Sequence, residues 1–154
     1  MTLIVFAISC SNNTESVNSK LASDIQDSVR LMTESIAKNV SREGPGAWLR
    51  YFENAPHFFM ASDGQLVFPN IDSAKSFINN VLIKNMPKIK LRWNNIRIDS
   101  LTNTFASISA VYHEDVTDAT GKTTPHDGYF TGIAHQTSQG WKLRNAHWSS
   151  IVSP

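Results

Sequence analysis

The spacing of apolar residues changes near Pro87, and this change constrains the fold more than any other feature of the sequence. Before it, apolar residues recur at intervals of three and four, which is typical of amphipathic helices. From Lys88 onward they alternate with polar residues, which is typical of strands with one buried face. Residues 88–152 therefore predict four long strands with short links, which pair as an antiparallel meander.

The first half of the chain predicts three helices and two short strands. An apolar stripe over 17–40 indicates a long amphipathic helix, with charges of both signs on its other faces. Pro45 suits the first turn of a second, shorter helix that also carries Phe52. Short strands are expected at 57–61 and 66–68, and a third helix follows them. Helices collected on one face of a meander define an α+β fold.

Two irregularities are expected among the long strands. The alternation changes parity at residues 94–95, which predicts a bulge in the first of them. The polar stretch at 117–127 contains Gly121 and Pro125, so it predicts a long hairpin loop between the second and third. The acidic and histidine residues on both sides of that loop, at 113–115 and 126–127, are interpreted as solvated side chains.

Composition bounds the class of protein. The chain has 154 residues, of which 41% are apolar, and this fits one globular domain with one core. A formal charge of +1 argues against nucleic-acid binding. No run approaches the roughly 18 apolar residues of a transmembrane helix. We expect one domain at 20–154, preceded at 1–19 by the remnant of a signal and a flexible tether.

The single cysteine, Cys10, is informative about the subcellular localisation of the protein. A short apolar run precedes it and a polar stretch follows, an order similar to the end of a bacterial lipoprotein signal, whose cysteine is lipidated. This interpretation predicts a domain lipid-anchored through Cys10 at the periplasmic side or surface of a cell envelope. However, no Lys or Arg precedes the run, and the alternative is a soluble cytoplasmic protein with a frayed N-terminus or a short strand with a buried free Cys.

Two segments carry a family resemblance. Residues 51–64 read YFENAPHFFMASDG, and residues 140–150 read GWKLRNAHWSS. Together with the order of elements, they resemble the SnoaL-like members of the NTF2-like superfamily over residues 17–152. The resemblance implies a cone-shaped, cystatin-like α+β fold, in which a curved antiparallel sheet and three N-terminal helices enclose a pocket. It also implies homodimers that pair through the sheet.

One departure from the superfamily affects the expected function. Its isomerases and cyclases use an aspartate inside the cone. In this sequence the corresponding strand carries no acid, since its residues are His57, Phe58, Phe59, Met60 and Ala61. The resemblance therefore does not carry that chemistry over, and it favours a binding function without a cofactor.

Aromatic residues supply candidates for the pocket wall, because small-molecule sites are mostly apolar with a few polar groups. Tyr112, Asn145 and His147 are the candidate polar groups. For a small apolar or aromatic ligand, the expected binding residues are Trp48, Phe52, Phe58, Met60, Phe77, Trp93, Tyr112, Phe130, Asn145 and His147.

The placement of His147 in the pocket depends on the register of the last hairpin. Strict alternation puts Asn145 and His147 on one face of the final strand, and Arg144 and Trp148 on the other. The latter two are candidates for contact with a second subunit. The register predicts three facing pairs: Gln136–Trp141, Gly132–Asn145 and Phe130–His147.

Three functions stay open at this point. The first is a ligand-binding or accessory domain without catalysis. The second is a dehydratase, isomerase or cyclase in which His147 acts as acid or base and Tyr112 donates a hydrogen bond. The third is a dimerisation module with a filled cone. No histidine pair has zinc-binding spacing and no nucleophile elbow is present, so neither a metal site nor serine hydrolysis is expected.

Overall fold

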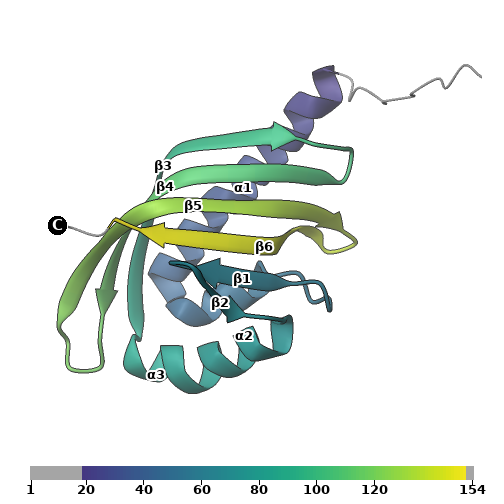
Figure 1. Ribbon diagram of the computed structural model, residues 1–154. Helices are drawn as coiled ribbons and strands as arrows, with labels where there is room; N and C mark the ends of the chain where they lie inside the picture. The colour runs from purple at the N-terminus through teal and green to yellow at the C-terminus, as the bar shows by residue number, and fades with distance from the viewer. Residues whose placement is uncertain (1–18, 152–154) are drawn as a thin grey trace, which may run out of the picture.

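The computed structural model describes residues 19–151, and its elements follow the predicted order (Figure 1). Its helical segments are α1 (Ser19–Glu43), the 3-10 helix η1 (Pro45–Arg50), α2 (Ile71–Phe77), the π-helical turn η2 (Ile78–Leu82) and α3 (Ile83–Asn85). Its strands are β1 (Phe59–Ser62), β2 (Gln65–Phe68), β3 (Lys88–Ser100), β4 (Phe105–Thr117), β5 (Thr123–Thr137) and β6 (Gly140–Ser150). Cys10 and the expected tether lie outside the described residues, so lipid anchoring stays a prediction.

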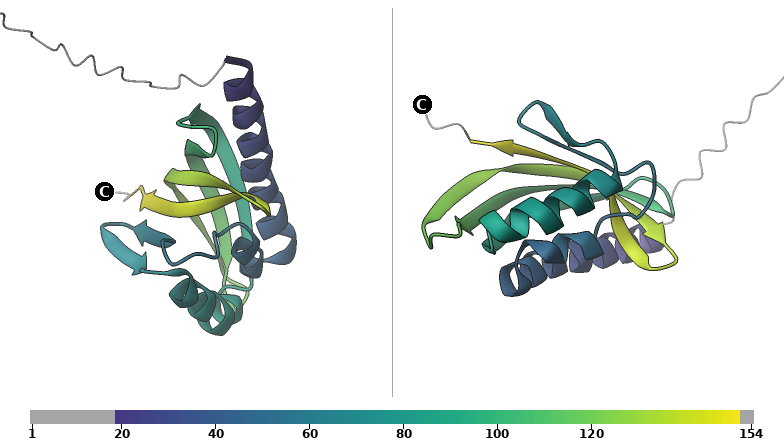
Figure 2. Two further views of the ribbon diagram at one scale, coloured as in Figure 1. Left: turned by 90° about the vertical axis from the view of Figure 1, so that its right-hand side faces the viewer. Right: turned by 90° about the horizontal axis from the view of Figure 1, so that it is seen from below.

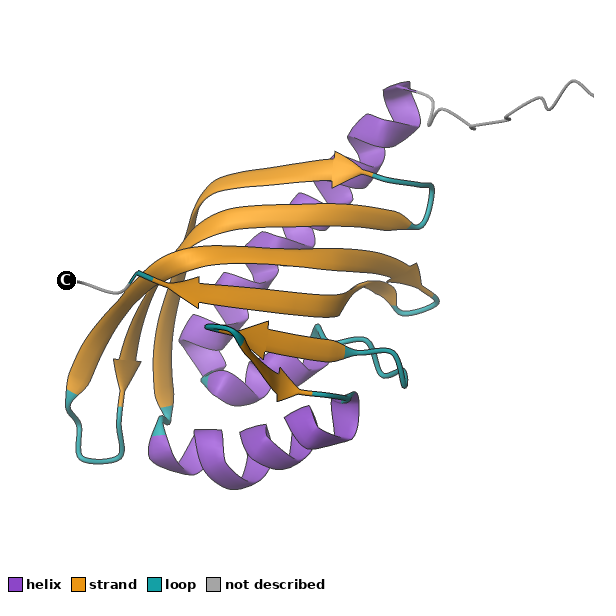
Figure 3. Cartoon of the chain, viewed as in Figure 1, coloured by secondary structure: helices purple, strands orange, loops and turns teal. Residues whose placement is uncertain are grey.

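The six strands form one curved sheet in the order β2-β1-β6-β5-β4-β3 (Figure 3). The meander from β3 to β6 is antiparallel, as predicted. The sheet as a whole is mixed, because β1 pairs in parallel with β6. Figure 2 shows the helices on the side toward which the sheet curves, with α2 to α3 beneath its end. The α+β cone predicted from the sequence is confirmed. None of the described helices is long and apolar enough to span a bilayer.

Helix α1 packs its apolar stripe against β3. Val29, Ile36 and Val40 are buried on this face. The indole of Trp93 in β3 donates a hydrogen bond to the carbonyl oxygen of Thr33, at 2.9 Å. An indole N–H that is partly buried usually finds such a partner, and this bond helps to fix the rotation of the helix on the sheet.

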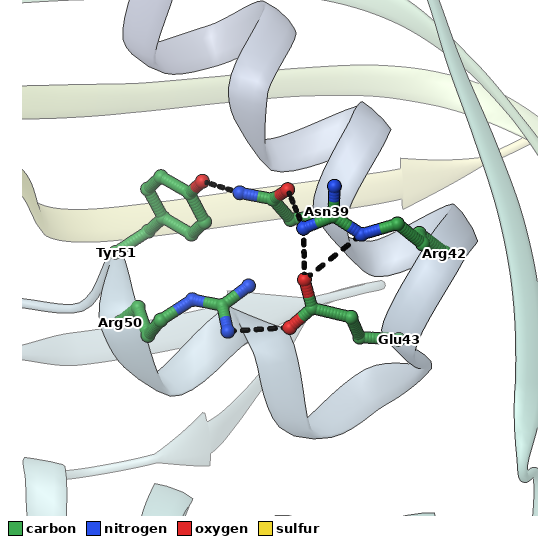
Figure 4. Close-up of polar contacts among 5 residues, drawn as sticks. All are labelled: Asn39, Arg42, Glu43, Arg50 and Tyr51. Carbon is green, nitrogen blue, oxygen red and sulfur yellow. Dashed lines mark hydrogen bonds and ion pairs between the residues drawn. The ribbon is translucent and has the colours of Figure 1, made fainter.

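A cluster of polar side chains joins the end of α1 to η1 (Figure 4). Glu43 accepts hydrogen bonds from Arg50 and Arg42, and Asn39 donates to the hydroxyl of Tyr51. The two guanidinium groups, Arg50 above all, lower the pKa of Glu43 to about 2. The second helix is shorter than predicted: η1 ends before Phe52, which instead forms a single bridge to β6.

The predicted bulge in β3 is confirmed. The pairing of β3 with β4 shifts between Asn94 and Arg97, and Asn95 has a positive φ of 52°. Asparagine tolerates this left-handed conformation better than most residues, because its short side chain bonds locally. The bulge keeps one face of β3 directed at the helices on both sides of the parity change.

The predicted long loop at 117–127 is wrong. Strands β4 and β5 continue as far as the facing pair Thr117–Thr123. The carboxylate of Asp118 accepts hydrogen bonds from the backbone N–H groups of Thr120 and Lys122, at 2.8 and 3.0 Å. This side chain closes the turn locally, so the polar residues on each side of it extend the sheet.

Candidate functional site

A cavity of about 370 Å³ lies between the concave face of the sheet, strands β1 and β2, and the segment from α2 to α3. Ligand sites typically measure roughly 300–1,000 Å³ and are mostly apolar, so this cavity is the candidate site. Its apolar lining residues are Trp48, Phe52, Met60, Val67, Phe68, Phe77, Ile78, Leu82, Met86, Ile89, Val116 and Trp148. Its polar lining residues are Ser62, Tyr112, Glu114, His126 and Ser150.

Trp148 is the centre of the aromatic wall. Its ring lies 4.7 Å from that of Tyr112 and 5.0 Å from that of Phe130, both edge to face. It also contacts Trp48 edge to face at 5.5 Å and stacks on Trp93 at 5.6 Å. These rings come from β3, β4, β5, β6 and η1, so one side chain of β6 holds five elements together around the cavity.

Tyr112 brings a hydroxyl to the cavity through a row of facing residues on three strands. Tyr112 faces Gly128 on β5, which in turn faces Ser150 on β6. A Cβ atom at Gly128 would lie 2.6 Å from the Tyr112 hydroxyl oxygen and 2.1 Å from the carbonyl oxygen of Ser149. Only glycine therefore leaves room for the ring. Burial raises the pKa of the Tyr112 hydroxyl, so it stays protonated and able to donate.

The hydroxyl of Tyr112 is the start of a short polar chain. It lies 3.4 Å from the hydroxyl of Ser150, whose own oxygen is 3.0 Å from the carboxylate of Asp63. The backbone N–H of Ser150 also donates to Asp63, at 2.7 Å. Asp63 lies in the turn between β1 and β2, so this chain ties the β1–β2 hairpin to the end of β6 beside the cavity.

Glu114 places a carboxyl in the cavity wall. Glu114 follows Tyr112 by two residues on β4, so the two side chains share one face of the strand. Glu114 faces Leu91 on β3 and His126 on β5. No residue in the described part of the chain gives its carboxyl a hydrogen bond or an ion pair. Burial alone raises the pKa of Glu114 from 4.5 to about 7, so near neutral pH it both accepts and donates protons.

Five of the ten expected binding residues line the cavity: Trp48, Phe52, Met60, Phe77 and Tyr112. Three others lie behind the wall. Phe58 and Phe130 are buried in the core, and the ring of Trp93 packs against both Phe130 and Trp148. The structure thus supports the expected position of the cavity, while ligand binding by these residues stays a prediction.

Asn145 and His147, the two other expected residues, lie outside the cavity. The pair Gln136–Trp141 forms as predicted, but the register of β5 and β6 shifts between Ile133 and Ala134, so Asn145 faces Ile133 and His147 faces Thr131. The predicted pairs Gly132–Asn145 and Phe130–His147 are wrong. The amide oxygen of Asn145 accepts a hydrogen bond from the N–H of Ile133, at 3.1 Å, which stabilises the bulge.

The bulge also exchanges the roles expected for the two faces of β6. His147 is exposed, while Trp148, expected at a subunit interface, faces the cavity. Arg144, the other expected interface residue, lies 3.7 Å from the carboxylate of Glu53. Homodimer formation through the sheet stays a prediction. Arg144 and Trp148 do not form the dimer surface expected from the sequence, because Trp148 faces the cavity and Arg144 lies beside Glu53.

Sequence reasoning missed Glu114 and His126, and one signal for them was present. Tyr112 was expected in the pocket, and residues two apart on a strand share a face, so Glu114 follows Tyr112 into the cavity. His126 then follows from pairing across β4 and β5. The interpretation of residues 117–127 as a loop interrupted that inference.

A second, more polar cavity of about 660 Å³ lies beside the β5–β6 turn. Glu53 lines it and is buried, with one carboxylate oxygen 3.0 Å from the Nδ1 atom of His135. The other carboxylate oxygen has Arg144 nearby but no hydrogen bond among the described residues. We interpret this cluster as a structural contact between the segment that precedes β1 and the hairpin formed by β5 and β6. Among residues 19–151 no group of three or more His, Cys, Asp or Glu side chains is placed to hold a metal ion.

Comparison with protein families gives one match. The sequence profile of the calcium/calmodulin dependent protein kinase II association domain matches residues 27–152. No curated protein matches the chain.

Solved structures show the same fold. An NTF2-like superfamily protein from Salmonella enterica serovar Typhimurium is 14% identical, with a TM-score of 0.66 over 88% of this chain and 94% of that one. A candidate scytalone dehydratase from Novosphingobium aromaticivorans is 12% identical, with a TM-score of 0.69 over 82% and 83%. A candidate calcium/calmodulin dependent protein kinase II association domain from Xanthomonas campestris is 18% identical, with a TM-score of 0.64 over 82% and 87%.

Proposed function

Because the chain belongs to the calcium/calmodulin dependent protein kinase II association domain family and has the NTF2-like fold, we propose that it binds a small, largely apolar molecule inside its cone. The supporting observation is the aromatic cavity of about 370 Å³ beneath Trp148. Apolar area removed from water contributes roughly 25 cal/mol per Å², so such a wall favours an aromatic or aliphatic body. The open cavity argues against a dimerisation module with a filled cone.

The proposal predicts that narrowing the cavity weakens binding of a small neutral aromatic alcohol, 2-naphthalenemethanol. Val67 lines the cavity on edge strand β2 and is 39% exposed, so Val67→Trp fills the mouth without strain in the core. Leu66→Trp introduces the same side chain next to it, at a position that is 61% exposed and outside the lining. By isothermal titration calorimetry, Val67→Trp should weaken binding about tenfold or more, and Leu66→Trp should match the wild type.

Two outcomes contradict the proposal. One is the absence of a saturable signal in the wild-type protein, and the other is equal weakening by both tryptophan variants. Thermal unfolding of the two variants serves as the control, because equal stability shows that the fold is intact in both.

A second candidate function, acid–base catalysis on the bound molecule, has one observation in its favour. The pKa of Glu114, near 7, suits proton transfer at neutral pH, and the hydroxyl of Tyr112 lies on the same wall. The sequence favoured His147 as the acid or base of such an enzyme. His147 is exposed, which argues against that role. On a substrate that the protein turns over, Glu114→Gln should lower kcat about 100-fold or more. Unchanged kcat would exclude Glu114 as the acid or base.

A further inference from the structure

We propose that the cavity selects molecules with a positively charged, hydrogen-bond-donating head, such as primary amines on an aromatic body, and that Glu114 receives this head. The inference rests on the proposed function, because it names the ligand class of the same cavity. It depends on three features of the lining: where the polar groups lie, which charges are present, and which of them already have partners.

The polar groups collect at one end of the cavity. Tyr112 and Ser150 belong to one row of facing residues across β4, β5 and β6, and Glu114 and His126 form the next row along β4 and β5. Apart from Ser62 at the end of β1, the rest of the wall is apolar, and it includes Trp48 and Phe52 from the segment after α1. A ligand that matches this wall has an apolar body and one polar end.

The charges at the polar end are unbalanced. Glu114 is the one carboxylate among the described lining residues, and none of those residues is a lysine or an arginine. His126 is the sole basic residue in this described lining, and it is exposed to solvent. Asp63 adds a second carboxylate at the rim through its hydrogen bonds to Ser150. A ligand carboxylate would meet like charge there, whereas an ammonium group would meet opposite charge.

Glu114 differs from the other acidic groups near the cavity because its carboxyl has no partner among residues 19–151. Asp63 accepts two hydrogen bonds from Ser150, and Glu53 pairs with His135 beside the second cavity. Glu114 has no such contact within the described residues. A half-buried carboxylate without a partner is costly, and an ammonium group that donates to it would remove part of that cost.

The test uses three probes that share a naphthalene ring: 2-naphthylmethylamine, 2-naphthalenemethanol and 2-naphthoic acid. They differ in charge at one end, and isothermal titration calorimetry at pH 8 measures each affinity while Glu114 is mostly ionised. We expect the amine to bind about tenfold more tightly than the alcohol, and the carboxylate about tenfold more weakly than the alcohol.

Two variants assign the preference to Glu114. Glu114→Gln keeps the shape of the side chain and removes its charge, so it should bring the amine to within about threefold of the affinity of the alcohol. Asp115→Asn removes the same charge from the next residue of β4, which pairs with Arg92 away from the cavity, and it should keep the preference for the amine.

The outcomes separate this inference from the proposed function. If the alcohol binds but the carboxylate binds as tightly as the amine, the inference is overturned and the proposed function stands. If the amine keeps its advantage in Glu114→Gln, Glu114 does not receive the head. If none of the three probes binds, the proposed function itself fails.

Discussion

Glu114→Gln is expected to stabilise the folded protein by about 3 kcal/mol at pH 8 and to change its stability little at pH 4. Burial raises the pKa of this carboxyl from 4.5, its ordinary value, to about 7 in the folded protein. Between these values the folded protein holds a proton that the unfolded chain has released, so stability falls as the pH rises. Above pH 7 the full difference between the folded and unfolded pKa values of Glu114 lowers the free energy of unfolding. Glutamine is neutral throughout and avoids it.

Urea denaturation of wild type and Glu114→Gln at pH 4 and pH 8 measures this effect. The other titratable lining groups, Tyr112 on β4 and His126 on β5, are present in both proteins, so their contributions largely cancel in the difference. Asp115→Asn is the matched control and should show no gain at pH 8, because Asp115 pairs with Arg92 at 3.3 Å. An equal effect of Glu114→Gln at both pH values would contradict the buried position of the carboxyl.

A residue that costs stability at neutral pH points to a role other than folding. Most buried charges in proteins are paired, and perturbed carboxyl groups without partners occur preferentially at functional sites. Replacing such a group commonly stabilises a protein while it removes activity or binding. The stability measurement and the probe measurement therefore test one carboxyl in two independent ways.

The architecture of this protein was predictable because period and turn chemistry are local properties. The stripe that became α1, the alternation that became β3 to β6 and the parity change at Asn95 each follow from a few neighbouring residues. The parallel pairing of β1 with β6 was not predicted. It joins segments 86 residues apart, as in the facing pair Phe59–Asn145, and no short pattern specifies such a partner.

The candidate site was less predictable, because one inserted residue reverses a strand face. The register shift beside Arg144 turns Asn145 and His147 outward and Trp148 inward. Strict alternation assumes no bulge, and nothing in the alternation of β6 marks this one. Glu114 was missed for a related reason. Its side chain faces the cavity only if β4 continues past it, and the length of β4 depends on the turn that Asp118 closes.

Phe58→Ala is expected to lower the free energy of unfolding by about 3–5 kcal/mol, the largest loss predicted for a single side chain here. Phe58 was expected to contact a ligand, but it is fully buried behind the cavity, with its ring 4.6 Å from that of Phe52. Truncation removes apolar contacts and leaves a void that its rigid neighbours cannot fill. It also removes the support of Phe52, which does line the cavity.

The adjacent residue provides the matched control. Phe59 is 42% exposed, so Phe59→Ala should cost less than about 1 kcal/mol in the same urea denaturation experiment. Equal costs for the two variants would contradict the placement of Phe58. If Phe58 acts through packing alone, Phe58→Ala held below its unfolding transition should bind 2-naphthalenemethanol within about threefold of the wild type. A larger loss of affinity at full folding would show that the ligand depends on the exact position of Phe52, and so that the packing behind the wall sets the shape of the site.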